Sequence, residues 1–308
     1  MKNNYRDKKF NKNKQQPQGQ ERKRFSGKDK TFGAASKEFI KNRNEDVEIN
    51  NRSKDIYENE EKITPREDII EGRNAVIEAL KSDRTVEQIL TAKGDREGSI
   101  NVIFALAKEK GIVVKEVDRK KLDGISETGA HQGVIAKVTP YKYFTVEDIL
   151  NKASDAGEKP FIVILDEIED PHNLGSIIRT AELCGVHGII IPKRRNAGIT
   201  PTVYKSSAGA IEHMMVAKVT NINSVIQDLK EKNIWVYGAD MEGEDYSYNA
   251  DLSGAVALVI GSEGKGMSKL TKEKCDKLIR IPMVGKINSL NASVAGGILM
   301  YEVLKTRI

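Results

Sequence analysis

Residues 161–180 read FIVILDEIEDPHNLGSIIRT, and this stretch decides the fold. The five apolar residues at 161–165 predict a strand buried on both faces, as strands of a parallel sheet are. An acidic turn with Pro171 follows. Helical spacing then begins, and its apolar positions are Leu174, Ile177, Ile178 and Ala181. A buried strand that leads through a turn into a helix indicates an α/β fold.

The same alternation of strands and helices continues to the C-terminus. Apolar runs predict further strands at 188–191, 234–237, 255–260 and 278–281. We therefore expect a mostly parallel sheet with helices on its faces. Upstream, residues from about 69 to 138 predict a smaller α/β unit, with helices at 71–80 and about 100–110, a strand-like piece at 89–90 and a strand at 112–114. The stretch 117–122 could open a short helix, and 131–138 is predicted to be a loop followed by a strand.

These patterns predict four parts of the chain. Residues 1–62 contain very few large apolar residues, so we expect a disordered tail. Residues 63–140 are predicted to form the small α/β domain. A linker is expected at 141–160, where a polar run lies, and the main α/β domain at 161–308.

Charge is distributed unevenly along the chain. Residues 1–43 contain 14 Lys and Arg and 4 Asp and Glu, a net charge of +10, whereas the whole chain carries +5. The remaining 265 residues therefore carry −5. A basic tail indicates a polyanionic partner, most plausibly nucleic acid. A solubilising tail without a partner is the alternative.

Several classes of protein are disfavoured by composition. No apolar run approaches the roughly 18 to 20 residues that cross a bilayer, and no signal peptide begins the chain. Cys184 and Cys275 are far apart, and the four histidines are scattered, so neither a disulfide framework nor a metal site is expected. We expect a cytoplasmic protein without metal or membrane. His131, which precedes a predicted strand, is the histidine of most interest.

The turn after the strand at 161–165 holds two polar candidates. Arg179 points away from the apolar stripe, and a guanidinium beside a strand end can bind phosphate with two nitrogens. Spacing alone nevertheless favours an ordinary surface arginine. It also favours a simple N-cap role for Asn173.

A second segment, at 260–268, reads IGSEGKGMS, and its glycines let the backbone approach a ligand closely. It is not a Walker A loop, because Gly266 follows Lys265, and Lys269 stands where a dinucleotide motif needs its last glycine. An ordinary turn is an equal alternative.

A third segment, at 281–298, reads IPMVGKINSLNASVAGGI and leads from a strand through a polar loop into the last helix. Ser289 and Asn291 suit either a site or a plain loop and cap. The apolar spacing of this helix is carried by Val294, Ile298 and Tyr301. Glycine inside a helix costs about 1 kcal/mol relative to alanine, so Gly296 and Gly297 suggest that another backbone packs closely there.

Together the three segments resemble the signature motifs of the SpoU–TrmH family of RNA ribose 2′-O-methyltransferases. The matching residues are Asn173, Leu174 and Gly175 with Arg179, then Gly261 to Gly264, then Ile281, Pro282 and Met283 with 289–295. The resemblance covers about residues 69–308. The small unit, with GRNAV at 72–76 and HQGV at 131–134, is similar to the RNA-binding domain of bacterial 23S ribosomal RNA guanosine 2′-O-methyltransferases.

This resemblance implies a SPOUT α/β knot, in which the C-terminal part threads a deep trefoil knot and binds S-adenosylmethionine. It implies a homodimer paired through the knotted domains, which would account for Gly296 and Gly297. The implied substrate is a guanosine of 23S ribosomal RNA in the peptidyl-transferase region. A transfer-RNA ribose methyltransferase, a resistance methyltransferase and a non-catalytic RNA-binding or ribosome-assembly protein are the alternatives.

The resemblance also implies roles for individual residues. Those around the reacting centre are Arg179, Asn173, Glu263, Ser289 and Asn291. Those that bind the cofactor are Gly261, Gly264, Ile281, Met283, Leu290 and Ala239. The arginine of the family is thought to assist deprotonation of the ribose hydroxyl. Because the pKa of arginine exceeds about 12, we expect Arg179 chiefly to position phosphate and stabilise alkoxide charge.

Overall fold

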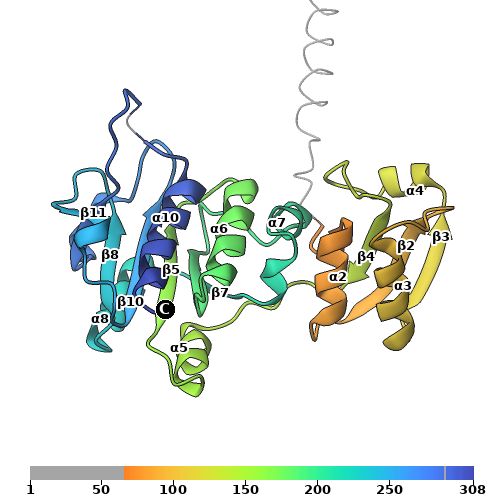
Figure 1. Ribbon diagram of the computed structural model, residues 1–308, viewed down its shortest axis with the longest axis horizontal. Coiled ribbons are helices and arrows are strands. Elements are labelled where there is room, and N and C mark those ends of the chain that lie inside the picture. The colour runs from red at the N-terminus through yellow and green to blue at the C-terminus, as the bar shows by residue number, and fades with distance from the viewer. Residues whose placement is uncertain (1–65, 288) are drawn as a thin grey trace, which may run out of the picture. The chain divides into compact units, whose positions relative to one another are not determined.

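The computed structural model of the 308-residue chain describes residues 66–287 and 289–308. These residues form two β-sheets, one of four strands and one of seven (Figure 1). The predicted tail at 1–62 lies outside the described residues. In the part of the chain that is described, no helix is both long enough and apolar enough to cross a membrane.

The four-stranded sheet has the order β1-β4-β2-β3. Strand β4 is antiparallel to β1 and β2, whereas β2 and β3 are parallel. The helix predicted at 71–80 begins slightly later, because Gly72 has a φ of 92° that no helical residue adopts. The elements of this part are β1 (Ile69–Glu71), α2 (Arg73–Lys81), β2 (Val86–Ala92), α3 (Ile100–Glu109), β3 (Val113–Val117), α4 (Arg119–Asp123) and β4 (Val134–Val138).

The seven-stranded sheet is parallel throughout and has the order β7-β6-β5-β10-β8-β11-β9. This confirms the α/β fold and its mostly parallel sheet. The five predicted strands are present, and two further strands that the sequence did not predict, β7 and β9, lie at the two edges of the sheet. The strands are β5 (Phe161–Asp166), β6 (Gly188–Pro192), β7 (Met215–Val219), β8 (Trp235–Ala239), β9 (Asp245–Tyr246), β10 (Val256–Gly261) and β11 (Lys277–Arg280).

Helices cover both faces of this sheet, because successive side chains of each strand point to opposite faces. Phe161, Val163 and Leu165 of β5 pack with α6 (Pro171–Leu183) and α10 (Ala292–Lys305). Ile162 and Ile164 pack on the other side with α5 (Val146–Asp155) and α8 (Ile222–Glu231). Shorter helices complete this part: α7 (Pro201–Ser206), η1 (Ala210–Glu212), η2 (Ser247–Asn249) and α9 (Lys269–Lys274).

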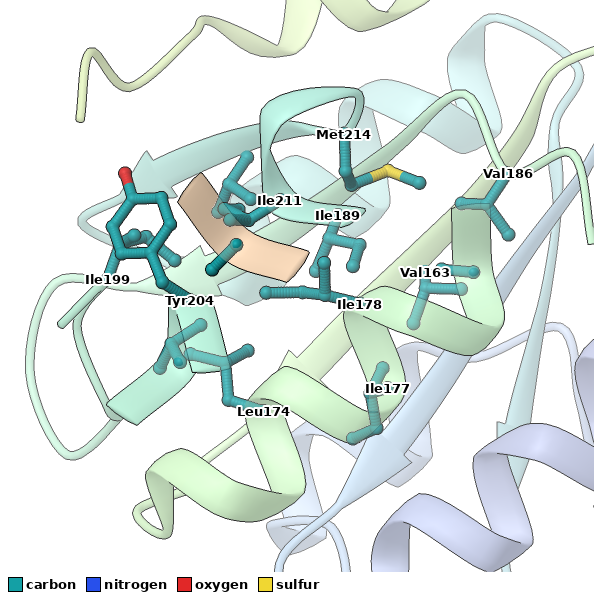
Figure 2. Close-up of a cluster of buried hydrophobic side chains, with 14 of the residues drawn as sticks. Val163, Leu174, Ile177, Ile178, Val186, Ile189, Ile199, Tyr204, Ile211 and Met214 are labelled. Carbon is teal, nitrogen blue, oxygen red and sulfur yellow. The ribbon is translucent and has the colours of Figure 1, made fainter. Parts of the chain in front are cut away.

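The apolar stripe predicted for α6 is confirmed. Figure 2 shows Leu174, Ile177 and Ile178 of α6 among the buried side chains that surround Val163 and Ile189 of the sheet. Each of these three α6 residues has no exposed surface. The helix is therefore fixed on the sheet by its apolar stripe.

The residues that give α10 its apolar spacing lie on its exposed side. Val294, Ile298 and Tyr301 are 50%, 36% and 56% exposed. The helix is apolar nearly all round, so spacing alone could not select the core-facing side. That side is formed by Ala292, Gly296, Leu299, Met300 and Val303.

Packing within the chain itself explains why position 296 is a glycine. A Cβ atom at Gly296 would lie 2.7 Å from Cδ1 of Ile260 in β10. The glycine thus makes room for a side chain of the sheet beneath α10. Close packing of another backbone is not needed to explain it, contrary to the expectation from sequence.

The predicted linker at 141–160 contains helix α5. Thr145 caps this helix in a capping box with Asp148. Ile149 and Ala153 are fully buried, and a Cβ atom at Gly188 of β6 would lie 2.4 Å from the Ile149 side chain. Part of the stretch is therefore packed structure, while the predicted domain boundaries stay a prediction.

Candidate active site

The topology of the seven-stranded sheet brings several loops to one edge, which is formed by the carboxyl ends of its strands. Strand β10 lies between β5 and β8, so the chain that leaves β5 toward β6 returns to the middle of the sheet. In parallel strands the carboxyl ends meet, and here Gly261 pairs with Asp166 and Ile279 with Ala239. Ligands of open α/β sheets bind at this edge, where the strand order reverses.

A cavity of about 300 Å³ lies at this edge. It is bounded by the segments that follow β8, β10 and β11 and by the segment before α10. All six residues predicted to bind the cofactor line it, namely Ala239, Gly261, Gly264, Ile281, Met283 and Leu290. The structure thus brings together positions that are far apart in the sequence.

The glycine loop between β10 and α9 folds back on itself. Ser262 and Gly266 exchange backbone hydrogen bonds of 3.2 and 2.9 Å. A Cβ atom at Gly261 would lie 2.2 Å from the carbonyl carbon of Gly266, and Gly264 and Gly266 have φ angles of 78° and 66°. The loop's own backbone therefore requires these glycines. Sequence reasoning had attributed them to the close approach of a ligand.

Three predicted polar residues form one hydrogen-bond network at this edge. The Nδ2 atom of Asn173 donates to Oε1 of Glu263 at 3.0 Å. The Nδ2 atom of Asn291 donates to Oδ1 of Asn173 at 2.9 Å and also to Oε1 of Glu263. Asn173 is 7% exposed, whereas Glu263 and Asn291 are exposed, so the network satisfies a buried amide through two partners at the surface.

The N-cap role expected for Asn173 is wrong. Asp170 is the N-cap of α6, and its side chain accepts a hydrogen bond of 2.9 Å from His172 N. Asn173 lies inside the first turn, where its side chain is free to reach Glu263. Asn291, in contrast, does cap α10, through Oδ1 bonds from Ser293 N and Val294 N.

The two other predicted catalytic residues lie differently. Ser289 lines the same cavity as Glu263. Arg179 is exposed on α6, and among the described residues its side chain makes no hydrogen bond or ion pair. The structure therefore gathers Asn173, Glu263, Ser289 and Asn291 and leaves Arg179 outside their network.

Charged residues that the sequence analysis missed also line the cavity. Lys272 Nζ lies 2.6 Å from Oδ2 of Asp240, and this hydrogen bond raises the pKa of Lys272. Oδ1 of Asp240 accepts from Glu242 N at 2.9 Å, so both its oxygens are engaged. Glu242 remains largely exposed. Asp240 directly follows β8, and this position at a strand end was the signal that could have identified it.

His131 lies in the part of the chain that forms the four-stranded sheet, and its role there is structural. Its ring is 2% exposed, with Nε2 2.9 Å from Oδ1 of Asp123 and Nδ1 accepting from Gly133 N at 3.0 Å. Across the described residues, no group of three or more His, Cys, Asp and Glu side chains is arranged to hold a metal ion.

Comparison with known proteins gives two family matches. Residues 160–301 match the model of the SpoU rRNA Methylase family. Residues 69–144 match the model described as RNA 2′-O ribose methyltransferase substrate binding. Each match falls on one of the two sheets.

Curated relatives extend over the same residues. A putative TrmH family tRNA/rRNA methyltransferase of Bacillus subtilis is 53% identical over 234 residues, which are 76% of this chain and 94% of that protein. A protein of Staphylococcus saprophyticus with the same description is 46% identical over equal shares.

Solved structures agree. An AdoMet-bound rRNA methyltransferase from Sinorhizobium meliloti has a TM-score of 0.65 at 25% identity and covers 78% of this chain and 88% of its own. The SpoU methyltransferase AviRb from Streptomyces viridochromogenes, in complex with AdoMet, has a TM-score of 0.64 at 25% identity, with 78% and 89% covered. The chain belongs to the SpoU/TrmH family of RNA methyltransferases.

Proposed function

We propose that this protein transfers a methyl group from S-adenosylmethionine to the ribose 2′-hydroxyl of a guanosine in 23S ribosomal RNA, in the peptidyl-transferase region. One observation carries the proposal. The six residues expected to bind the cofactor line one cavity, and Glu263, held by Asn173 and Asn291, lines it too. The two AdoMet-bound structures of similar fold support the choice of cofactor.

The cavity suits S-adenosylmethionine in size and chemistry. Small-molecule sites measure about 300 to 1,000 Å³ and are mostly apolar with a few polar groups. Here Ile281, Met283 and Leu290 offer apolar surface for an adenine, and the carboxylates of Glu242 and Glu263 suit a cationic group. The bound cofactor would supply a methyl group on a positively charged sulfur.

The polar network would orient the acceptor hydroxyl. Oε1 of Glu263 is fixed by Asn173, Asn291 and, at 3.4 Å, the backbone nitrogen of Ala292. Within the described residues, Oε2 of Glu263 has no hydrogen-bond partner and is free to accept a bond from a ribose hydroxyl. A fixed acceptor aligns the attacking oxygen and takes up its proton as the bond to the methyl group forms.

Arg179 would act beside the dimer interface that we propose for α10. The exposed apolar residues Val294, Ile298 and Tyr301 lie on this helix, and Leu183 at the end of α6 is 70% exposed. A Cβ atom at Gly297 would lie 3.7 Å from Thr180, the neighbour of Arg179. A second copy that covers this surface would therefore bring its candidate active site close to Arg179 of the first copy.

Arg179→Lys tests the role of the guanidinium. We expect methyl transfer to fall at least about tenfold with unchanged cofactor affinity, because lysine cannot hold phosphate with two nitrogens. Near-full activity would rule out such positioning.

Mixing subunits tests whether Arg179 acts across the dimer. A heterodimer of Arg179→Lys and Asn173→Ala chains has one intact site if Arg179 serves its partner, and none if it serves its own chain. Activity of the mixture above that of either impaired variant alone would support the arrangement across the dimer.

The alternative substrate is transfer RNA, because the curated relatives are described as tRNA/rRNA methyltransferases. The separate substrate-binding part at 69–144 favours ribosomal RNA. A non-catalytic scaffold is disfavoured by the intact Asn173–Glu263–Asn291 network. The trefoil knot and the cytoplasmic location stay predictions.

The decisive experiment supplies labelled S-adenosylmethionine with 23S ribosomal RNA or transfer RNA from a strain that lacks this gene. Nuclease digestion and mass spectrometry then identify the labelled nucleoside. A single 2′-O-methylguanosine in 23S RNA is expected. Label in transfer RNA alone would establish the alternative, and absence of both transfer and cofactor binding would support the scaffold.

A further inference from the structure

A second cavity, of about 270 Å³, adjoins the cofactor cavity. The two share Ser262, Glu263 and Lys265, which belong to the glycine loop after β10. The remaining wall of the second cavity comes from the segment after β5 and from Asn173 of α6. Because a methyl acceptor must lie beside its donor, the second cavity stands where the acceptor nucleoside is needed.

The segment after β5 gives this cavity an acidic lining. Glu167, Glu169 and Asp170 all line it. Carboxylates accept hydrogen bonds and repel phosphate, so a ligand here must present N–H or O–H donors. These side chains are not arranged to hold a metal ion, as noted above for the described residues. The lining therefore suits the donor edge of a nucleobase.

Two of these carboxylates are positioned by their neighbours. Oε1 of Glu167 accepts from Nη1 of Arg195 at 3.0 Å. The adjoining Ile168 bonds through its backbone to Asn196 Oδ1 at 2.9 Å and to Ala197 N at 2.8 Å. Asp170 uses Oδ1 to cap α6. The wall of the cavity is thus tied to the loop that follows β6.

That loop carries a row of cations. Lys193, Arg194 and Arg195 follow β6 and are all exposed. Lys265 of the glycine loop lines both cavities, and Arg195 contacts Glu167 in the wall of the second one. Carboxylates in the wall, with cations beside them, match a nucleotide whose base contacts the carboxylates and whose phosphates contact the cations.

We propose that the second cavity holds the base of the nucleotide to be methylated, and that Glu169 and Asp170 read the Watson–Crick edge of a guanine. This inference rests on the proposed function. Guanine alone among the four RNA bases presents two adjacent donors, N1–H and N2–H₂, along that edge, and a carboxylate accepts both. Enzymes that do chemistry on a base commonly take it out of the stack and read this edge, and the same recognition would serve an enzyme that acts on the attached ribose.

The test compares guanosine with inosine, which lacks only the 2-amino group. The position methylated in 23S RNA is first mapped, and a synthetic RNA hairpin with that sequence is made with guanosine or inosine there. For the wild-type protein we expect kcat/KM for methyl transfer to be at least about tenfold higher with guanosine.

Two variants assign the preference to this cavity. Glu169→Gln keeps the side chain's shape, and Asp170→Asn keeps an N-cap residue on α6. In both, the ratio of guanosine to inosine should fall toward one, with unchanged affinity for S-adenosylmethionine. Glu231→Gln, on the exposed end of α8, is the matched control and should keep the wild-type ratio.

Each other outcome overturns the inference. A wild-type ratio near one, or a ratio unchanged in both variants, while guanosine is still methylated, would show that these carboxylates do not read a guanine. A methylated pyrimidine or adenosine, or a wild-type protein that binds no S-adenosylmethionine, would contradict the proposed function itself, so the two failures are distinguishable.

Discussion

Among single residues, Asn173 links the two cavities most directly. It lines the second cavity, donates to Glu263 and accepts from Asn291. Asn173→Ala would leave the Glu263 carboxylate without one of its donors, a loss of about 1 to 3 kcal/mol. If that loss falls on the transition state, methyl transfer should slow by about 10- to 100-fold.

Kinetics and calorimetry together check this prediction. Affinity for S-adenosylmethionine should stay within a few-fold, because Asn173 does not line the cofactor cavity. Asn151→Ala, at an exposed position of α5, is the control and should be neutral. An equal loss of cofactor affinity would show that the network shapes the cofactor cavity instead.

Gly261 permits the turn on which the cofactor cavity depends. In Gly261→Ala the new Cβ atom would meet the backbone of Gly266 and Met267 at 2.2 Å, so the loop must move. Overpacking of this kind costs about 1 to 3 kcal/mol. We expect cofactor affinity to fall at least about tenfold in calorimetry.

Gly254 provides the matched control. A Cβ atom there meets nothing within 4 Å, and its φ angle is not positive. Gly254→Ala should therefore leave cofactor binding unchanged. Equal effects of the two substitutions would mean that the close approach at Gly261 does not matter.

At the scale of elements, α10 has two apolar faces and one of them is exposed. An exposed apolar stripe on a helix is typical of a surface that another molecule covers. Tyr301→Glu places a charge on this stripe and should convert a dimer into a monomer, as sedimentation velocity would detect. The reason is the cost of burying an unpaired carboxylate in an interface.

Val102→Glu is the control for this substitution. Val102 is 45% exposed on α3, outside the seven-stranded sheet and its helices. It should leave the sedimentation coefficient unchanged. A wild-type chain that already sediments as a monomer would contradict the proposed dimer.

At the scale of the whole molecule, positive charge is concentrated in the N-terminal tail. Residues 1–43 carry +10, whereas the remainder carries −5. If the tail contacts RNA phosphates, deletion of residues 1–62 should weaken RNA binding and reduce its dependence on salt, because fewer counterions are released. Binding isotherms between 50 and 200 mM salt measure that slope.

A variant in which ten Lys and Arg residues of the tail are changed to Gln separates the effect of the tail's charge on RNA binding from the effect of its length. It should behave like the deletion. An unchanged slope in both would show that the tail serves only to solubilise the chain.

Much of this molecule follows from local sequence. Apolar runs predicted β5, β6, β8, β10 and β11, and the central strands β5 and β10 are buried on both faces and have no polar alternation. These strands are local features, so neighbouring residues suffice to reveal them. The resemblance to a known family named six residues for the cofactor, and the structure places all six along one cavity.

Other features depended on contacts between distant segments. Sequence spacing assigned Asn173 to a cap and did not show that Gly296 of α10 faces the sheet, because their partners Glu263 and Ile260 are far from them in the chain. The second cavity arises where the ends of β5 and β10 meet. Strand pairing across about 95 residues brings those ends together, and a one-dimensional pattern carries no information about which strands will pair.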